Sequence, residues 1–550
     1  MNRITIGLLF CAMVCQGQPV IESAENAAGL MKAGLPNSAL AQGSLVVIKG
    51  RNLGQRALAQ GGIPLPLELA GTSAQITVGA TTLAMPLNYV IGTSDNRTQL
   101  SAVIPSATPA GLGSIRVTHG GEVSTAFPVT IARSAFGIFT INSMGSGAAV
   151  VFTGSMLNTP TESLVPGSVA QIFGTGLGPV PYPDRAPASA GNLNVDVEVW
   201  VGFKKAEVHY QGRVPEIPSI DQINFTIPAD TPPGCEVALL VRAGGTISNA
   251  TTIPVAPKGG SCSDPLGYPA DLFARAAQGA HVGAITLAKA VTSPSAPGTA
   301  ADRTRLDSLT GSFQRLDYSQ LLSYPGNGPS VDSCVVSTFV GQSPPATPGP
   351  LFVGLDAGPA LTVAGPLGSR TVERHIQHKG LYRSEMAMGS SNSSTASTTQ
   401  EFLTPGRFSA LGVGGADLGA FSASLTWPAG FTWTNQNMLS SVPRSQDLVV
   451  RWEGVATDGY VTISGYSIGG PMSAPVGASF SCLAKGSAGR FTVPAIVLQL
   501  LPASPMLADG TPAGQLSVAA SGTPVPFSAA GLDYGALNCT SALARSVRFE

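Results

Sequence analysis

The sequence predicts an all-β protein made of several β-sandwich domains. Only 11% of its 550 residues are charged, well below the roughly one quarter found in ordinary soluble domains. Gly (66) and Pro (44) together make up one residue in five, and both break helices. Because 43% of the residues are hydrophobic, the chain can still bury cores, so neither a helical bundle nor a disordered chain fits.

The overall charge excludes one class of function. The chain has 30 Lys and Arg residues and 31 Asp and Glu residues, which gives a formal net charge of −1. Nucleic acids and anionic membranes are bound through concentrated basic surfaces, and the composition has no such excess. At about 150 residues per domain, the length corresponds to three or four domains. We therefore expect a multidomain β protein without a nucleic-acid partner.

The first 17 residues predict a signal peptide. Arg3 gives a positive start, an apolar run covers residues 4–14, and a small residue and a polar stretch follow. Acylation of Cys11 or Cys15 is an alternative, but bulky residues precede both. The apolar run is too short to cross a bilayer, and no later segment approaches about 20 apolar residues. We expect an exported protein, secreted or at the cell surface, with the periplasm as an alternative, and no transmembrane segment.

The next 240 residues contain one unit twice. Residues 43–54 (GSLVVIKGRNLG) match residues 167–178 (GSVAQIFGTGLG) at an offset of 124. The Ile-Pro and Thr-Pro-x-Gly turn residues in 104–111 match those in 227–234 at an offset of 123. An offset that holds over such a distance indicates duplication of a whole domain. Short alternating strands between Gly and Pro turns predict an immunoglobulin-like β-sandwich in each copy. The copies are assigned to residues 18–134 and 135–260.

One strand of the second copy singles out a tryptophan. Alternate positions are apolar and should face the core: Leu193, Val195, Val197, Val199 and Val201. Trp200 has the opposite parity, on a polar face, so we expect its ring to be partly exposed. It is the best single candidate for a ligand contact, since exposed aromatic rings stack on sugars or partner side chains. Two alternatives remain: a bulge near Gly202 that buries the ring, or a neighbouring domain that covers it.

Three segments of the second copy carry a family resemblance: "PGSVAQIFGTGLGPV", "IPADTPPG" and "GGTISNATTIPVA". They resemble IPT/TIG domains, which are immunoglobulin-like sandwiches of the E-set type. The segment "FGIFT" (residues 136–140), at the start of the second copy, further resembles a large acidobacterial family of secreted, mostly uncharacterised proteins. The resemblance covers roughly residues 20–258 and implies the fold and export, but no catalytic site. Some TIG domains bind DNA, and the lack of a basic patch argues against that role here.

The C-terminal region, residues 261–550, predicts further strands. Phe421, Ala423, Leu425 and Trp427 alternate with polar residues, as do apolar residues in 448–453 and 461–464. Short helices are expected within 270–278 and 494–501. "GGADLGAFSASL" and "GRFTVPAIVLQLLPASP" resemble a domain of the same secreted family, again without an assigned activity. We expect one or two β-sandwich domains here, with any split near residues 430–440.

The cysteines predict disulfides. Five cysteines remain after the signal peptide, without CxxC spacing and without a nearby histidine, so a zinc site is not expected. In an oxidising compartment, two disulfides and one leftover thiol are the simplest arrangement. We expect Cys235 to pair with Cys262 across the edge of the second copy, and Cys334 with Cys482, leaving Cys539 unpaired.

Two motifs look catalytic but do not form a coherent set. Residues 465–469 (GYSIG) match the GxSxG pattern of serine hydrolases, in which a histidine follows the serine in the chain. The last histidine is His378, so Ser467 is not expected to be a nucleophile. Glu373, His375 and His378 are the only clustered ligand types, but basic neighbours would repel a cation. We expect no catalytic, metal or cofactor site.

The function expected from the sequence is therefore a secreted, non-enzymatic, immunoglobulin-like protein that binds a surface or matrix component, either a glycan or a protein. The alternative is a secreted carbohydrate-active enzyme whose active site lies within residues 265–550. A cleft with two carboxylates about 5–9.5 Å apart would favour the enzyme. The identity of the ligand and the oligomeric state cannot be read from the sequence.

Overall fold

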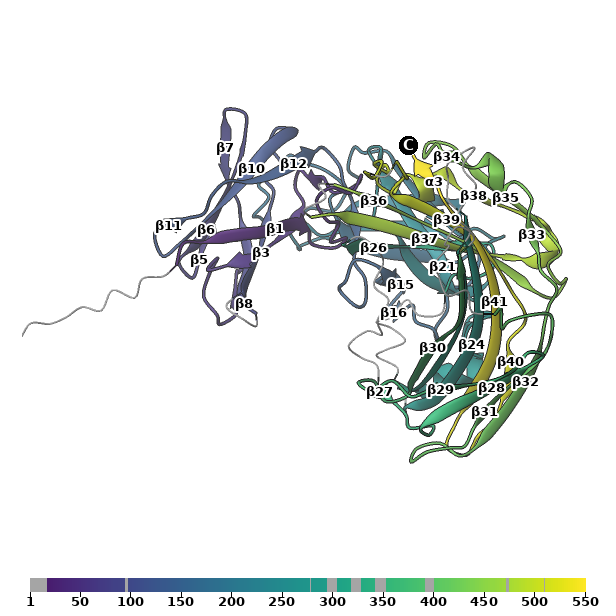
Figure 1. The fold of residues 1–550 in the computed structure, drawn as a ribbon. Coiled ribbons are helices and arrows are strands. Elements are labelled where there is room, and N and C mark those ends of the chain that lie inside the picture. The colour runs from purple at the N-terminus through teal and green to yellow at the C-terminus, as the bar shows by residue number, and fades with distance from the viewer. Residues whose placement is uncertain are drawn as a thin grey trace, which may run out of the picture.

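The computed structural model describes residues 17–93, 97–276, 278–293, 304–317, 328–341, 353–390, 400–470, 474–508 and 510–550. The predicted signal peptide, residues 1–17, lies outside these ranges except for Gly17. The described chain is almost entirely β-structure (Figure 1).

The first module, residues 18–134, is a sandwich of two sheets. Within the described residues the sheet orders are β1-β3-β9-β8-β4 and β2-β12-β10-β6-β5, with β7 and β11 added to the second. Apolar residues of alternating parity, such as Ile48, Ile76 and Ile115, fill the space between the sheets. The strands are β1 (Val20–Asn26), β2 (Leu40–Ala41), β3 (Leu45–Arg51), β4 (Ala59–Gln60), β5 (Glu68–Leu69), β6 (Thr72–Val78), β7 (Thr81–Ala84), β8 (Leu87–Gly92), β9 (Arg97–Val103), β10 (Gly111–His119), β11 (Glu122–Val123) and β12 (Phe127–Ala132).

The second module, residues 135–260, has the same two layers, but one strand joins them. Residues 204–206 of β19 pair with β18, and residues 207–213 pair with β20. The valines expected to face the core do so, with Val199 and Val201 fully buried. The strands are β13 (Gly137–Ile138), β14 (Gly147–Ala148), β15 (Val151–Thr153), β16 (Met156–Leu157), β17 (Val169–Thr175), β18 (Val197–Val201), β19 (Lys204–Arg213), β20 (Asp221–Thr226), β21 (Gly234–Ala243), β22 (Thr246–Ile247) and β23 (Thr251–Val255).

The two modules repeat in hydrogen bonding as well as in sequence. β3 pairs with β9 as β17 pairs with β20, in equivalent registers. The N–H of Leu53 donates to Thr98 Oγ1 over 2.7 Å, and the N–H of Leu177 donates to Asp221 Oδ2 over 2.8 Å. Each acceptor lies 123 residues from its counterpart, the offset seen in the sequence. The Gly-rich segment around Leu177 is therefore a turn of the sandwich, held by an acceptor from the neighbouring strand.

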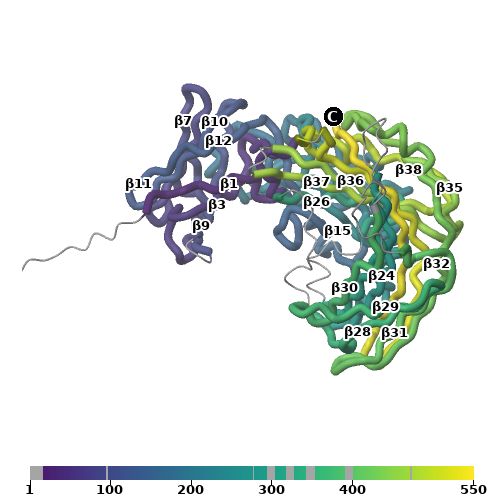
Figure 2. The backbone as a smooth tube through the Cα atoms, viewed as in Figure 1, coloured from purple at the N-terminus to yellow at the C-terminus, as the bar shows by residue number. Residues whose placement is uncertain are grey.

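The C-terminal region is organised around one large sheet. Among the described residues it has ten strands in the order β26-β37-β36-β39-β41-β24-β25-β27, with β30 on β25 and β40 on β41. Figure 2 shows the late, yellow part of the chain beside the teal β24, because β41 pairs in parallel with β24. The strands of the large sheet are β24 (Ala280–Ser293), β25 (Thr304–Leu316), β26 (Ser333–Val340), β27 (Val353–Gly354), β30 (Leu381–Ser390), β36 (Tyr460–Gly469), β37 (Val476–Lys485), β39 (Gly514–Ser521), β40 (Val525–Phe527) and β41 (Tyr534–Ser546).

Smaller sheets cover one face of the large sheet at its two ends, on the outer side of its curve (Figure 1). Ile285, Leu309 and Leu537 pack under β28, β31 and β32, whereas Ile463, Phe480 and Val518 pack under β35 and β38. The covering strands are β28 (Ala360–Gly365), β29 (Gly368–Glu373), β31 (Gly406–Gly412), β32 (Phe421–Trp427), β33 (Thr432–Trp433), β34 (Ser441–Val442), β35 (Leu448–Glu453), β38 (Arg490–Val493) and β42 (Arg548–Phe549).

The two cores share one sheet. The chain passes from the cover of one core to the cover of the other between β32 and β33, close to residues 430–440. The large sheet contains strands from both sides of that point and is continuous under both cores. The C-terminal region is therefore two cores on one sheet, rather than two sandwiches joined by a linker.

Helices are few and short. The described helices are α1 (Ala270–Ala276), α3 (Ala495–Leu498) and the 3-10 turns η1 (Gln436–Met438) and η2 (Gly486–Ala488). Among the described residues, no helix has the length and apolar character needed to cross a membrane.

Candidate functional site

The structure pairs four cysteines. Cys235 and Cys262 form one disulfide with Cα atoms 5.2 Å apart, and Cys334 and Cys482 form the other with Cα atoms 4.0 Å apart. These are the two pairs expected from the sequence. Cys539 is buried and not disulfide-bonded, and burial raises the pKa of its thiol. The bonded cysteines therefore brace the second module and the edge of the large sheet.

Trp200 lies at the junction between the second module and the C-terminal region. Its ring is partly exposed, and its Nε1 donates to Glu198 Oε2 over 3.3 Å. With Phe203 and the buried Leu240, the ring packs against the core that includes α3. The neighbouring domain thus covers Trp200, one of the alternatives that the parity argument left open. The partial exposure agrees with the strand parity, and a ligand contact at Trp200 stays a prediction.

Ser467 is a buried side chain in strand β36. It has no exposed surface, and its hydroxyl shares a hydrogen bond of 2.8 Å with Ser504, which also accepts the N–H of Phe549. A nucleophilic serine would need a sharp turn and an accessible hydroxyl. Strand β36 instead holds this hydroxyl on the buried, core-facing side of the sheet.

The histidine pair lies on the surface near β29. The rings of His375 and His378 are 4.8 Å apart, and Glu373 is exposed. The basic neighbours are engaged elsewhere, Arg374 with Asp356 and Lys379 with Asp417. No group of three or more His, Cys, Asp or Glu side chains in the described part of the chain could hold a metal ion.

The face of the large sheet opposite the two cores is a different kind of surface. We call it the open face, and it extends over β26, β37, β36, β39, β41, β24 and β25. The paired registers place mainly Ser, Thr, Ala, Asn, Gln and Tyr side chains there, mostly half-exposed, together with some apolar residues such as Val335, Phe339 and Ile468. Among the described residues of these strands, the one charged side chain with this parity is Lys485, at the end of β37. Charged residues are mostly found on solvated surfaces, so a face seven strands wide with a single charged side chain among its described residues is unusual.

The two ends of the open face are covered by other parts of the chain. Leu272 and Ala276 of α1 pack on Val282 and Leu316 at one end. At the other end, the second module reaches the β26 edge, where the N–H of Ala238 donates to a serine hydroxyl of β26 over 2.9 Å. The accessible part of the open face therefore lies between α1 and the second module.

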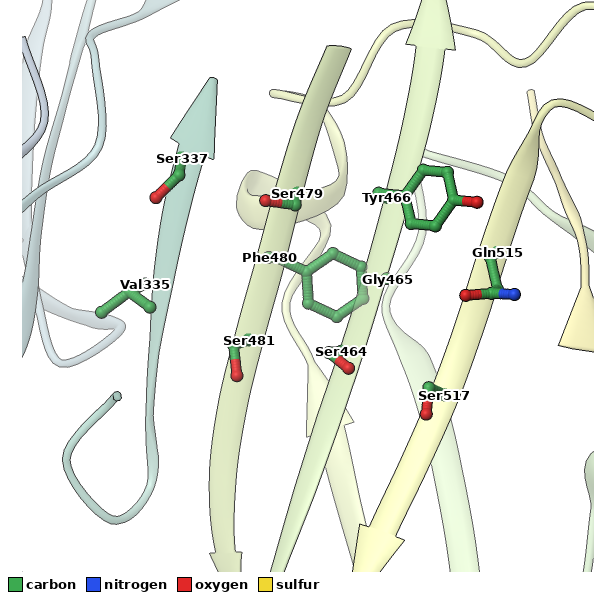
Figure 3. Close-up of a pocket in the computed structure, with 10 residues that line it drawn as sticks. All are labelled: Val335, Ser337, Ser464, Gly465, Tyr466, Ser479, Phe480, Ser481, Gln515 and Ser517. Atoms are coloured by element: carbon green, nitrogen blue, oxygen red, sulfur yellow. The ribbon is translucent and has the colours of Figure 1, made fainter. Parts of the chain in front are cut away.

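A hollow of about 260 Å³ lies on four strands at the β26 end of the open face. Figure 3 shows Tyr466 on β36 with its ring seen nearly face-on, so that the ring plane runs along the sheet. Gly465, Phe480 and Val335 complete the lining. The polar side chains around the hollow are Ser337, Ser464, Ser479, Ser481, Gln515 and Ser517.

The lining of the hollow is neutral. None of its ten residues is acidic, basic, histidine or cysteine, so it contains no carboxylate pair, metal ligand or thiol. Burial raises the pKa of Tyr466, which keeps its hydroxyl protonated. Within the described chain, no hydrogen bond to another protein group occupies the serine and glutamine side chains of the hollow. The site can therefore donate and accept hydrogen bonds, and its lining contains no carboxylate, histidine or lysine that could activate the serine hydroxyls.

A pair of carboxyl groups lies outside this site, beside the Cys235–Cys262 bond. Thr252 Oγ1 donates to Glu236 Oε2 over 2.6 Å, and the N–H of Cys235 donates to Asp264 Oδ2 over 2.8 Å. Burial, reinforced by the nearby Asp264, raises the pKa of Glu236 to about 7. Burial also raises the pKa of Asp264. Both carboxyl groups accept hydrogen bonds at the end of the second module, which is a structural role.

The hollow escaped prediction from the sequence. Strand β36 shows the signal, since Thr462 and Ser464 alternate with Val461 and Ile463. The alternation shows that one face is polar, but it does not say which strands are neighbours. β39 lies beside β36 although residues of other strands separate them in the chain. A search for several strands whose polar parity contains only uncharged residues would have found the open face.

Comparisons with known proteins add little about function. No family model matches the chain, and no curated protein matches it either. Similar solved structures include domains 4–9 of the surface-layer protein SbsC, at 11% identity over 94% of this chain and 83% of that one, with a TM-score of 0.18. The Yersinia pseudotuberculosis adhesin InvE is 13% identical over 43% of this chain and 58% of that one, with a TM-score of 0.13. The titin I9–I11 tandem is 9% identical over 70% of this chain and 94% of that one, with a TM-score of 0.12.

Identities and TM-scores this low carry no argument about ligand or activity. The sheets and cores themselves define the class: an all-β protein with two duplicated immunoglobulin-like sandwiches and a C-terminal region built on one large sheet.

Proposed function

We propose that the protein is an exported, non-enzymatic binding protein of a cell surface or extracellular matrix. The two immunoglobulin-like modules act as a spacer, and the large sheet of the C-terminal region carries the binding surface. The partner is an extracellular glycan or protein. The observation that carries this proposal is the open face, which is accessible, almost free of charge in its described strands and hollowed at one end.

Several features support export. Two disulfides form among the five cysteines that follow the predicted signal peptide, as suits an oxidising compartment. The low charge and the many turns fit a secreted β protein. On this proposal the modules are of the IPT/TIG type and belong to the acidobacterial kind of secreted protein that their turn residues resemble.

The enzyme alternative receives less support from the site. Glycoside hydrolysis uses two carboxyl groups facing a cleft, and the hollow is lined by none. The half-buried pair Glu236 and Asp264 is engaged with Thr252 and a backbone N–H at a module edge. A binding role therefore fits this surface better than catalysis.

The proposal is tested with the purified chain lacking residues 1–17. We expect binding to at least one member of a glycan array or of a panel of matrix proteins, with no turnover in a broad hydrolase panel. Binding to neither panel would contradict the proposal. Turnover of a polysaccharide at a rate that survives removal of contaminants would replace it with the enzyme alternative.

A further inference from the structure

The hollow on the open face suggests a particular class of ligand. We propose that it binds a neutral polysaccharide, with one sugar residue seated against Tyr466 and neighbouring residues lying along the hydroxyl rows of the sheet. The inference rests on the proposed function and makes it more specific, since it selects glycan over protein and assigns the site.

The arrangement of polar groups suits a chain of hydroxyl groups. The strand register aligns Ser337, Ser479, Tyr466 and Gln515 in one row across four strands. Adjacent strands are about 4.8 Å apart, so the row presents a hydrogen-bonding group at each such step. A ligand lying across the strands would meet donors and acceptors in regular succession.

A second row lies beside the first. It contains Ser481, Ser464 and Ser517, which the same strand pairings place opposite one another. Two residues along a strand separate the rows, a distance of roughly 6.7 Å. The two rows lie on either side of the hollow, so a ligand seated in it can form hydrogen bonds with both rows.

The charge of the surface selects the kind of glycan. A sulfated or uronate-bearing chain would need cations, and the described open-face strands supply only Lys485, which does not line the hollow. A cationic ligand would need carboxylates, and the hollow has none. Buried polar groups left unpaired are costly, so a neutral lining is matched by a neutral, hydroxyl-rich ligand.

Tyr466 supplies the apolar part of the contact. Its ring packs on one side against the cluster of Phe339, Ile468 and Ala513, which holds it in place. The ring remains partly exposed and lies along the sheet (Figure 3). A flat aromatic surface beside hydrogen-bonding groups receives the C–H face of a sugar ring while the hydroxyl groups are bonded at its edge.

The size and composition of the site disfavour a protein partner. The hollow, at about 260 Å³, is smaller than the roughly 300–1,000 Å³ of sites for drug-sized ligands, and so fits a single small group such as one sugar residue. Protein interfaces are enriched in aromatic residues, Met and Arg and depleted in Ser and Ala. The described residues on the open face include Ser or Ala on every strand and neither Met nor Arg, although a few tyrosines are present.

The test measures binding of soluble neutral polysaccharides by affinity electrophoresis and calorimetry, with sulfated and uronate-bearing polysaccharides as comparators. We expect the wild-type chain to bind a neutral polysaccharide with an affinity that changes little between about 0.05 and 0.5 M NaCl.

Tyr466→Ala should weaken binding about tenfold or more, as loss of a central aromatic contact does. Ser464→Leu should do the same by filling the hollow, and its side chain points away from the core, so folding should be retained.

Tyr460→Ala is the matched control. Tyr460 lies on the same strand and the same face as Tyr466 but does not line the hollow, so its loss should change the affinity less than about twofold. Thermal melting of each variant separates lost binding from lost folding.

Four outcomes would overturn the inference. If Tyr466→Ala and Ser464→Leu both bind as the wild type does, the hollow is not the site. If only charged polysaccharides bind, and salt releases them, the ligand class is wrong. If the protein binds matrix proteins but no glycan, this inference fails while the proposed function stands, whereas no binding to either panel removes both.

Discussion

Trp200 shows what one half-buried aromatic residue does at a domain junction. Its face of β18 is polar for most of its length, but Leu240 lies opposite it in the register and is almost fully buried. Trp200 and Leu240 together meet the core of the C-terminal region. The parity rule correctly assigned the face, but a single sequence does not say what lies on that face. A tryptophan among polar residues signals a contact, and here the contact is another part of the same chain.

Removing the Trp200 ring should therefore weaken the junction rather than a ligand site. Trp200→Ala leaves a cavity between the second module and the C-terminal region, and we expect the free energy of unfolding to fall by about 1–3 kcal/mol, below the range for a fully buried tryptophan. Urea unfolding measures this loss. The control is Leu112→Ala, since Leu112 is 81% exposed and should cost little. An unchanged unfolding midpoint for Trp200→Ala, with loss of ligand binding, would restore the ligand assignment.

Glu236 makes stability depend on pH. Its pKa rises from 4.5 to about 7 on folding, so the folded state binds the proton more tightly than the unfolded state. The stabilisation is complete below about pH 4.5 and is lost as the pH rises to about 7. The shift corresponds to at most about 3 kcal/mol. Glu236→Gln should flatten the stability curve between pH 5 and pH 7 in urea titrations, whereas the exposed Glu207→Gln should not. A wild-type curve that rises over this interval would contradict the assignment.

At the scale of elements, the second module and the large sheet differ in how far the sequence determines them. The module strands pair within their own copy of about 120 residues, and the duplication provides an internal comparison, so turns and strand parity could be read directly. The large sheet pairs β24 with β41 across about half the chain, with Val282 opposite Tyr534. Alternation identifies such strands one at a time, but their pairing depends on contacts far apart in sequence. For this reason the open face, and with it the hollow, required the structure.

The two disulfides close loops of very different length. Cys235–Cys262 closes 27 residues and ties the segment just after the second module to β21, whereas Cys334–Cys482 closes 148 residues and ties β26 to β37. In the chain-entropy model these loops contribute roughly 3.5 and roughly 5 kcal/mol, respectively. We expect Cys334→Ala with Cys482→Ala to destabilise the protein more than Cys235→Ala with Cys262→Ala. It should also expose β26 to amide hydrogen exchange, because β26 is an edge strand. Equal protection of β26 with and without the bond would show that pairing alone holds the edge.

At the scale of the whole molecule, the first two modules are joined by a buried polar network. Arg213 forms a buried ion pair with Asp221, and its Nη2 also donates to Gly43 O over 3.0 Å and to Gly178 O over 2.8 Å. Gly43 belongs to the first module, so one guanidinium links both. The N–H of Leu45 adds a 2.8 Å hydrogen bond to Thr175 Oγ1 across the same junction. Polar contacts of this kind fix an angle between modules, since they lose strength steeply when displaced.

Loss of Arg213 should therefore loosen the junction between the first and second modules and also lower the free energy of unfolding. Arg213→Ala leaves Asp221 buried without its ion-pair partner, and we expect the free energy of unfolding to fall by about 3–5 kcal/mol. The two carbonyl groups of Gly43 and Gly178 also lose their shared donor, so the first module should move relative to the second. Small-angle scattering would then show a broader distribution of overall dimensions, and Arg116→Ala, at an exposed arginine of β10, should leave both measurements unchanged. If Arg213→Ala lowers stability while the scattering profile stays that of the wild type, the network stabilises the second module without setting the angle between the modules.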